Sequence, residues 1–154
     1  MKIKKVGIII FVRLNSRRLP LKAFKKVQNT FVLDHIYRRI KKVDSKTKII
    51  IATTKSNLDK KIVAYCKKNH IYFFRGSGKD VALRAINCCK KYKFDSFLRV
   101  CADRIFFDYK LAKKMIKFYQ KNNYEVVTNS LYKTFPKGLA CEIINYKTFK
   151  ANYK

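Results

Sequence analysis

The chain has 154 residues, a length typical of one domain that can bury a substantial core. Hydrophobic residues make up 48% and aromatic residues 14%, which excludes an intrinsically disordered protein despite a formal net charge of +29. No segment approaches the roughly 18 uninterrupted apolar residues of a membrane helix, and the basic residues that follow the short apolar N-terminal run argue against a signal peptide.

The large positive charge has two explanations. A strongly positive field attracts nucleic acids, anionic lipids and phosphorylated metabolites. Lysine is nevertheless spread along almost every segment, together with many Ile, Phe, Tyr and Asn residues, as the codon usage of an A+T-rich genome produces. Because no block of like charges stands apart as a tail, we favour genomic bias over a nucleic-acid-binding role.

The cysteine pattern indicates free thiols. There are 5 cysteines without a C-x-x-C pair, and an odd number cannot be fully paired within one chain. Free thiols are typical of a reducing compartment, so we expect a cytoplasmic protein. Cys88 and Cys89 are adjacent on an expected helix and are interpreted as packing residues. His35 and His70 lack partner ligands nearby in the sequence, so a zinc site is not expected.

The first expected element is a strand at residues 6–12, whose unbroken apolar run suits a strand buried on both faces of a parallel sheet. A basic loop follows it, containing Arg13, Ser16, Arg17, Arg18 and Lys22. Cations and a hydroxyl group at the carboxyl end of a strand suit a polyphosphate, because open α/β sheets bind ligands at that edge. A solvated basic loop without a ligand is the alternative interpretation.

Strands and helices alternate along the rest of the chain. Expected strands cover residues 48–53, 71–74, 94–101, 124–129 and 139–144. Expected helices cover residues 31–42, 58–69, 79–92 and 109–122, with a last helical stretch from residue 147. Asn29 or Thr30 would cap the first helix, and Ser56 or Asn57 the second. This alternation predicts βαβ units, right-handed crossovers and one mainly parallel sheet, which is an α/β fold.

Polar side chains recur at the carboxyl ends of the expected strands. They are Arg13, Ser16, Arg18, Lys22, Thr53, Arg75, Ser77 and Asp103. Polyphosphate chemistry needs cations and usually Mg²⁺, which takes one or two carboxylates together with phosphate oxygens. Asp103 is the best-placed carboxylate for that ion. A helix-cap or turn aspartate is the alternative interpretation of Asp103.

Five short motifs follow one another in a recognisable order. They are VRLNSRRLPLK at residues 12–22, ATT at 52–54, FRGS at 74–77 with Asp80, Val81 and Arg84 after it, RVCAD at 99–103, and PKGLACE at 136–142. In this order they resemble the motifs of cytidylyltransferases that activate sugar acids. The resemblance is strongest to the spore-coat polysaccharide branch, near the CMP-KDO and CMP-acylneuraminate synthetases, and runs from Val6 to the last residue.

The resemblance implies a three-layer, Rossmann-like nucleotide-diphospho-sugar transferase fold. Residues 1–154 would form a single nucleotidyltransferase domain, the N-terminal, nucleotide-binding portion of a fold that is truncated at its C-terminal end. In the family, the part that follows contributes to sugar binding and dimer contacts, so a homodimer is an open expectation.

The resemblance also implies a reaction. A sugar hydroxyl attacks the α-phosphorus of CTP and expels pyrophosphate, which gives a CMP-sugar for surface polysaccharide biosynthesis. The expected partners are therefore CTP and a sugar or sugar acid, without a membrane or a nucleic acid.

Site roles carry over residue by residue. The expected catalytic residues are Arg13, Lys22 and Asp103. The expected nucleotide-binding residues are Arg13, Ser16, Arg18, Lys22, Thr53, Arg75 and Ser77. Asp103 would hold Mg²⁺, the expected cofactor, with Glu142 as a candidate second ligand.

The sequence departs from the family pattern where ligand would be contacted. Asn15 and Leu21 replace glycines, and leucine is poorly suited to a left-handed backbone conformation. Ala140 replaces an aspartate of the metal site, and Glu142, which would face the same side of a strand, is a partial substitute. Two alternatives therefore remain: a truncated or degenerate, non-catalytic relative that keeps the fold, and a basic nucleic-acid-binding module.

Overall fold

The computed structural model describes residues 4–16, 19–132, 134–136 and 138–154. Its elements in chain order are β1 (Val6–Phe11), η1 (Lys22–Phe24), β2 (Lys26–Val27), β3 (Thr30–Phe31), α1 (Val32–Lys41), β4 (Ile49–Thr54), α2 (Lys60–Lys68), β5 (Phe73–Gly76), α3 (Val81–Tyr92), β6 (Ser96–Cys101), α4 (Tyr109–Lys121), β7 (Val126–Thr128), β8 (Glu142–Asn145) and α5 (Tyr146–Ala151). No helix within the described residues is long and apolar enough to cross a membrane.

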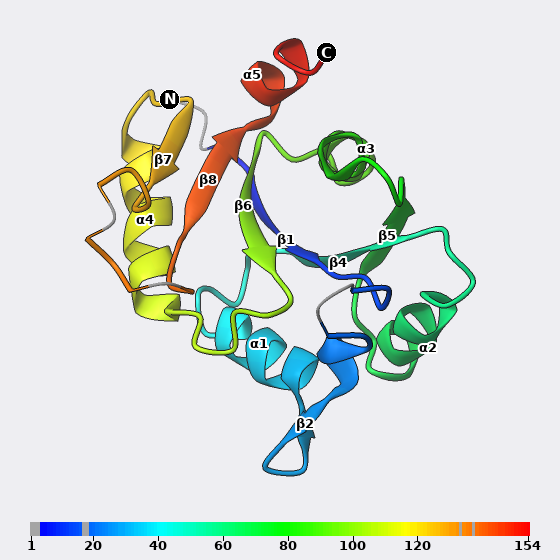
Figure 1. The fold of residues 1–154 in the computed structure, drawn as a ribbon. Helices are drawn as coiled ribbons and strands as arrows, with labels where there is room; N and C mark the ends of the chain where they lie inside the picture. The colour runs from blue at the N-terminus through cyan, green and yellow to red at the C-terminus, as the bar shows by residue number, and fades with distance from the viewer. Residues whose placement is uncertain (1–3, 17–18, 133, 137) are drawn as a thin grey trace.

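A six-stranded sheet in the order β5-β4-β1-β6-β8-β7 forms the middle layer (Figure 1). β1 lies between β4 and β6 and is parallel to both, and β5 is parallel to β4. β8 runs antiparallel to β6, and β7 antiparallel to β8. The mainly parallel α/β sheet expected from the sequence is confirmed, with its antiparallel pairs confined to one edge.

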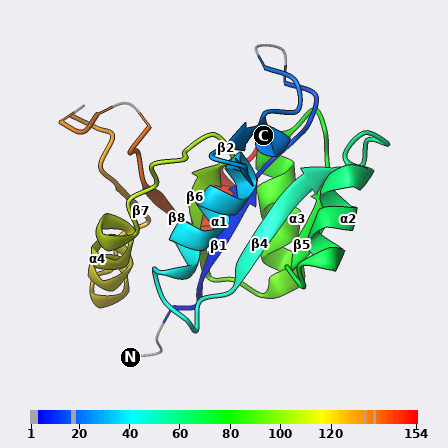
Figure 2. The same ribbon diagram turned by 90° about the horizontal axis from the view of Figure 1, so that it is seen from below.

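Helices cover both faces of the sheet, as the expected three-layer architecture requires (Figures 1 and 2). On one face, Ile8 and Ile10 belong to a buried cluster with side chains of α1, α2 and α4. On the other face, Ile9 and Phe11 pack in a second cluster with α3, and aromatic side chains of α5 border it. The apolar run of β1 is therefore buried on both faces, because alternate side chains enter different layers.

The helix caps differ from those expected. Gln28 and Asn29 have φ angles of 48° and 61°, and they form the turn of a short hairpin between β2 and β3. Asn29 therefore does not cap α1, whose N-cap is Phe31. The N-cap of α2 is Asp59 rather than Ser56 or Asn57. Asn tolerates left-handed geometry as well as a cap position, so its presence before a helix was ambiguous.

Candidate active site

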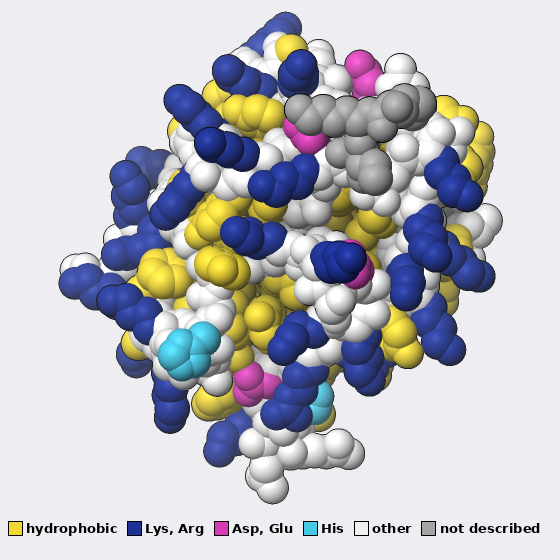
Figure 3. All heavy atoms as spheres, turned by 180° about the vertical axis from the view of Figure 1, so that it is seen from behind, with side chains coloured by type: hydrophobic (Ala, Val, Ile, Leu, Met, Phe, Trp, Pro, Cys, Tyr) yellow, Lys and Arg dark blue, Asp and Glu magenta, His cyan; other side chains and the backbone are white. Residues whose placement is uncertain are grey.

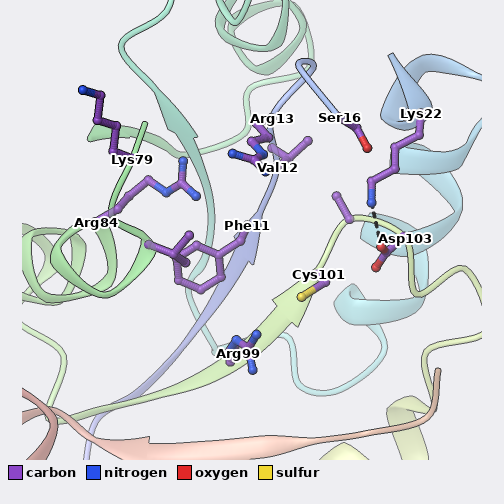
Figure 4. Close-up of a pocket in the computed structure, with 12 residues that line it drawn as sticks. Phe11, Val12, Arg13, Ser16, Lys22, Lys79, Arg84, Arg99, Cys101 and Asp103 are labelled. Atoms are coloured by element: carbon purple, nitrogen blue, oxygen red, sulfur yellow. Dashed lines mark hydrogen bonds and ion pairs between the residues drawn. The ribbon is translucent and has the colours of Figure 1, made fainter. Parts of the chain in front are cut away.

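A cavity of about 570 Å³ lies at the carboxyl ends of β1 and β6, in the range of about 300–1,000 Å³ typical of small-molecule sites (Figure 4). Its walls come from β1 and the loop after it, the first turn of α3, and β6 with the loop after it. The lining residues are Phe11, Val12, Arg13, Ser16, Lys22, Lys79, Val81, Arg84, Arg99, Cys101, Ala102 and Asp103. The cavity therefore opens at the sheet edge where α/β proteins bind ligands.

The cavity is strongly basic. Its lining includes the cationic side chains of Arg13, Lys22, Lys79, Arg84 and Arg99. Among the described residues, Asp103 is the one acidic side chain in the lining. Such an excess of cations in a concave site attracts a polyanion and raises its local concentration.

Lys22 and Asp103 join two loops across one end of the cavity. Lys22 begins η1, and its Nζ lies 2.6 Å from Oδ2 of Asp103, which follows β6 (Figure 4). The two side chains are 27% and 46% exposed, so the ion pair contributes only about 0.2–1 kcal/mol to stability. It leaves both groups accessible to a ligand.

Asp59 fixes the loop after β1 against the end of β4. Its Oδ1 accepts a hydrogen bond from the backbone N–H of Leu14 at 2.9 Å. Its Oδ2 accepts from the N–H of Thr54 at 3.2 Å and from the Thr54 hydroxyl at 2.5 Å. Asp59 is only 1% exposed, and these bonds satisfy a carboxylate that would otherwise be costly to bury. It holds the start of the basic loop in place from outside the cavity.

Arg84 is the cavity's buried cation. It projects from the first turn of α3, is 2% exposed, and its Cζ lies 5.7 Å from the centre of the Phe11 ring. Its Nε and Nη1 have no hydrogen-bond partner among the described residues. Burial lowers the pKa of the guanidinium, Asp59 opposes this shift, and Arg13 adds to it.

The comparison with protein families places this cavity in a known context. The cytidylyltransferase family matches the chain over residues 7–150. The chain belongs to the cytidylyltransferase family. The match includes β1 from Gly7 onward, the basic loop and all the residues that line the cavity.

Similar proteins support this assignment. The spore coat polysaccharide biosynthesis protein SpsF of Bacillus subtilis is 28% identical over 143 residues, which cover 89% of this chain and 58% of that protein. The structure of a cytidylyltransferase from Leptospira borgpetersenii superposes with a TM-score of 0.90 at 31% identity, covering 96% of this chain and 63% of that one. This chain therefore spans less than two thirds of the length of either relative.

A more distant structure shares the fold. The synthetase that forms CMP:2-keto-3-deoxy-manno-octonic acid, solved with CTP, superposes with a TM-score of 0.74 at 14% identity, and the match covers 95% of this chain and 76% of that one. At this identity, the similarity shows the fold alone. It confirms the Rossmann-like nucleotidyltransferase architecture.

The cytidylyltransferase motifs contribute unequally to the cavity. Arg13, Ser16, Lys22 and Asp103, all expected site residues, lie together in its lining. Arg18 falls outside the described residues. The lining also contains Lys79, Arg84, Arg99 and Cys101, which the expected site did not include. Arg84 could have been found from its place in the family's third motif, whereas nothing in the sequence marked Lys79.

Three expected nucleotide-binding residues lie outside the cavity lining. Thr53 is fully buried in β4, and its hydroxyl has no partner among the described residues. The Arg75 side chain donates to the backbone carbonyls of Thr54 and Ser56, at 3.1 and 3.0 Å. The Ser77 hydroxyl accepts from the N–H of Asp80 at 3.0 Å. In this structure, Arg75 and Ser77 organise the chain between β4 and α3.

The two candidate metal ligands, Asp103 and Glu142, have different ion-pair partners, and only Asp103 lines the cavity. Oε2 of Glu142 lies 2.6 Å from Nη1 of Arg99, its partner across β6 and β8. Within the part of the chain that the structure describes, no group of three or more His, Cys, Asp or Glu side chains could hold a metal. The backbone carbonyl of Ala140 accepts a hydrogen bond from Arg104, and its side chain offers no ligand. Asp103 is therefore the one carboxylate among the described residues that lines the cavity.

Proposed function

We propose that this cytidylyltransferase transfers the CMP group of CTP to a hydroxyl of a sugar or sugar acid and releases pyrophosphate. The observation that carries the proposal is the basic cavity in which Arg13, Ser16, Lys22 and Asp103 of the family motifs meet. The name of the Bacillus relative supports a role in surface polysaccharide biosynthesis, and the CMP-sugar-acid synthetase with the same fold supports CTP as the donor.

The chain's own groups suit the triphosphate. Arg13 offers a guanidinium fork, Lys22 a point charge and Ser16 a hydroxyl donor, all along the loop after β1. Charge-assisted hydrogen bonds from such groups neutralise phosphate oxygens and orient the α-phosphorus. Catalysis would consist mainly of positioning and of stabilising the charge that develops on the leaving group.

The reaction is an in-line displacement at phosphorus. The acceptor hydroxyl oxygen forms a bond to the α-phosphorus, and the bond from that phosphorus to the bridging oxygen of the β-phosphate breaks. The electron pair leaves with pyrophosphate, whose charge Lys22 and Arg13 would stabilise. The hydroxyl proton passes to solvent or to a base near the acceptor.

The residues present fit a Mg²⁺ ion that arrives with the nucleotide. Mg²⁺ is bound through one or two carboxylates plus phosphate oxygens in many nucleotide sites, and Asp103 lines the cavity while Glu142 is engaged by Arg99. Asp103 would thus be the protein ligand. When bound, such an ion polarises phosphate oxygens and neutralises their charge.

Two further expectations belong to this proposal. The 5 cysteines are free thiols, and 4 of them are buried. Free thiols are typical of a reducing compartment, which supports the cytoplasm as the site of the reaction. A homodimer would place two such cavities in one particle.

The test measures pyrophosphate release from CTP with Mg²⁺ and a panel of sugar acids and neutral sugars. We expect turnover with at least one acceptor, and a loss of about 100-fold or more in Asp103→Asn, because the ligand of the charge-stabilising ion is weakened. Glu125→Gln, the same change on an exposed residue outside the cavity, serves as the control and should keep full activity.

Two outcomes would count against the proposal in different ways. Calorimetric binding of CTP without turnover on any acceptor would favour the non-catalytic relative that keeps only the nucleotide site. Absence of CTP binding would overturn the proposed function altogether.

A further inference from the structure

Arg84 presents unused hydrogen-bond donors to the cavity. A guanidinium is costly to bury unless its N–H groups are paired, because it loses hydration that nothing replaces. Arg84 is 2% exposed, yet its Nε and Nη1 lack a partner among the described residues. Figure 4 shows its guanidinium directed into the cavity beside the Phe11 ring. A hydrogen-bond acceptor on a bound ligand would supply the partner that these Arg84 donors lack.

The fold fixes the position of this side chain. In the first turn of a helix, a long side chain points back toward the N-terminus, which for α3 is the cavity. A Cβ atom at Gly76 would lie 2.8 Å from Cγ of Arg84, so the absence of a side chain there gives the arginine its path. The Phe11 ring supports the guanidinium from one side. A donor held in this way loses little conformational entropy when a ligand binds.

The buried carboxylate nearby does not satisfy these donors. Asp59 attracts the Arg84 charge, but both of its oxygens already accept bonds from Leu14 and Thr54. The charge of Arg84 is thus partly compensated while its hydrogen-bond donors remain free. A neutral acceptor on a ligand can therefore complete the site without a second full negative charge.

The position of Arg84 favours the nucleobase over the phosphates. The groups suited to phosphate, Ser16 and Lys22, lie with Asp103 on the other side of β1 from Arg84 in Figure 4. Around Arg84, the lining combines the cations Lys79 and Arg13 with the apolar side chains of Phe11, Val12 and Val81. A flat heterocycle fits between such walls, and its acceptor edge would meet the guanidinium.

We propose that Arg84 selects the base of the nucleotide by donating hydrogen bonds to the adjacent O2 and N3 acceptors of cytosine. This inference rests on the proposed function, because it assigns a part of the same cavity. Uracil carries a hydrogen on N3 and so opposes a donor to a donor, which a buried arginine fork rejects. Arg84 is in this view the residue that discriminates CTP from UTP.

The experiment measures dissociation constants of CTP and UTP by calorimetry for the wild-type chain and for Arg84→Lys. Lysine keeps the charge but not the planar fork, so we expect the preference for CTP over UTP to fall by roughly tenfold or more. Arg38→Lys, the same change at an exposed arginine of α1 that does not line this cavity, should leave the preference unchanged. Circular dichroism and thermal melting establish that the variants are folded.

A second measurement needs no variant. On the wild-type chain, 3-deazacytidine triphosphate, in which a C–H group replaces N3, should bind at least about tenfold more weakly than CTP, because it lacks the N3 acceptor. Equal binding of the two would contradict the proposal.

The remaining outcomes separate this inference from the proposed function. If Arg84→Lys weakens CTP and UTP equally, Arg84 binds phosphate and the inference is wrong while the function stands. If Arg84→Lys keeps the wild-type preference for CTP over UTP, the inference about Arg84 is wrong, and the proposed function still stands. If the wild-type chain binds no CTP, both fall.

Discussion

Cys101 differs from the other cysteines in its surroundings. Cys66, Cys88, Cys89 and Cys141 are buried, and burial raises the pKa of each thiol, to about 12 for Cys66, Cys89 and Cys141. Cys101 is half-buried and lines the basic cavity at the end of β6. Since the thiolate is the reactive form, the buried thiols are chemically protected and Cys101 is accessible.

We therefore predict that a disulfide reagent such as dithionitrobenzoate modifies Cys101 rapidly in the folded protein at mildly alkaline pH. The other thiols should react only after unfolding, because their deprotonation is disfavoured in the folded state. Absorbance at the thionitrobenzoate band measures the count and the rate. CTP should slow the fast reaction, and Cys101→Ser should abolish it. A second fast thiol, or a fast phase that survives in Cys101→Ser, would contradict the assignment.

The short helical turn η1 begins from a strained residue. Leu21 has φ 56° and ψ 18°, a left-handed conformation that costs a residue with a side chain about 1–2 kcal/mol. Its N–H donates to the carbonyl of Leu14 at 3.0 Å, and its carbonyl accepts from Phe24 at 2.8 Å. These bonds hold the backbone in the conformation that the family's glycine would adopt freely, so the basic loop keeps its path at an energetic cost.

Leu21→Gly should consequently stabilise the protein by up to about 1 kcal/mol, since relief of strain exceeds the entropy that glycine loses on folding. Leu21 is 38% exposed, so little burial is lost with its side chain. Denaturant unfolding gives the free-energy difference. Leu19→Gly, at an exposed leucine without a left-handed φ, is the control and should be neutral or destabilising. A stability loss in Leu21→Gly equal to that of Leu19→Gly would show that Leu21 is not strained.

At the scale of elements, the sequence predicted what depends on local pattern. β1 and β4 were recognisable because strands buried on both faces need continuous apolar runs. β5 begins at Phe73, two residues later than expected, and β8 begins at Glu142, after Ala140. These limits depend on the register with neighbouring strands, which a single segment does not encode.

The site was predictable to the extent that it follows from topology. Arg13 and Asp103 were found because the carboxyl ends of parallel strands meet at one edge of the sheet. Arg75 lies opposite Thr53 in the pairing of β5 with β4, and its side chain donates a hydrogen bond to the backbone carbonyl of Thr54 instead of lining the cavity. The sequence does not show which of these orientations the side chain adopts. The burial of Asp59 and Arg84 depends on segments far apart in the chain, so the third motif marked Arg84 without showing that it is buried, and Asp59 did not stand out from the exposed charges.

The whole molecule carries its charge over its surface. Lysine and arginine side chains are spread over the face in Figure 3, between apolar and neutral areas, and acidic side chains are few. Two ion pairs occur among the described residues, Lys22 with Asp103 and Arg99 with Glu142. With a formal net charge of +29, most cations lack an oppositely charged neighbour, and their mutual repulsion disfavours the compact state.

The melting temperature should accordingly rise with ionic strength, because at 0.1 M salt the repulsion between exposed charges more than about 10 Å apart is largely screened. A stabilisation of 1 kcal/mol would raise Tm by roughly 3 °C for a chain of this size. Calorimetric or fluorescence melts between low salt and about 0.5 M sodium chloride measure the effect. Sucrose, which does not screen charge, provides the comparison. A Tm that is flat or falls with salt would show that repulsion is not a significant part of the energetics.

The contact between Lys22 and Asp103 couples two binding events thermodynamically. Each group neutralises the other at 2.6 Å. A triphosphate that draws Lys22 away would release Asp103 for a cation, and a cation on Asp103 would release Lys22 for phosphate. By linkage, each ligand then raises the affinity for the other by the same factor. Since an exposed ion pair is worth about 0.2–1 kcal/mol, the cooperativity from this contact amounts to no more than roughly fivefold. The cavity thus holds a pair of mutual counterions, and a nucleotide and its metal ion would replace each of them with a new partner.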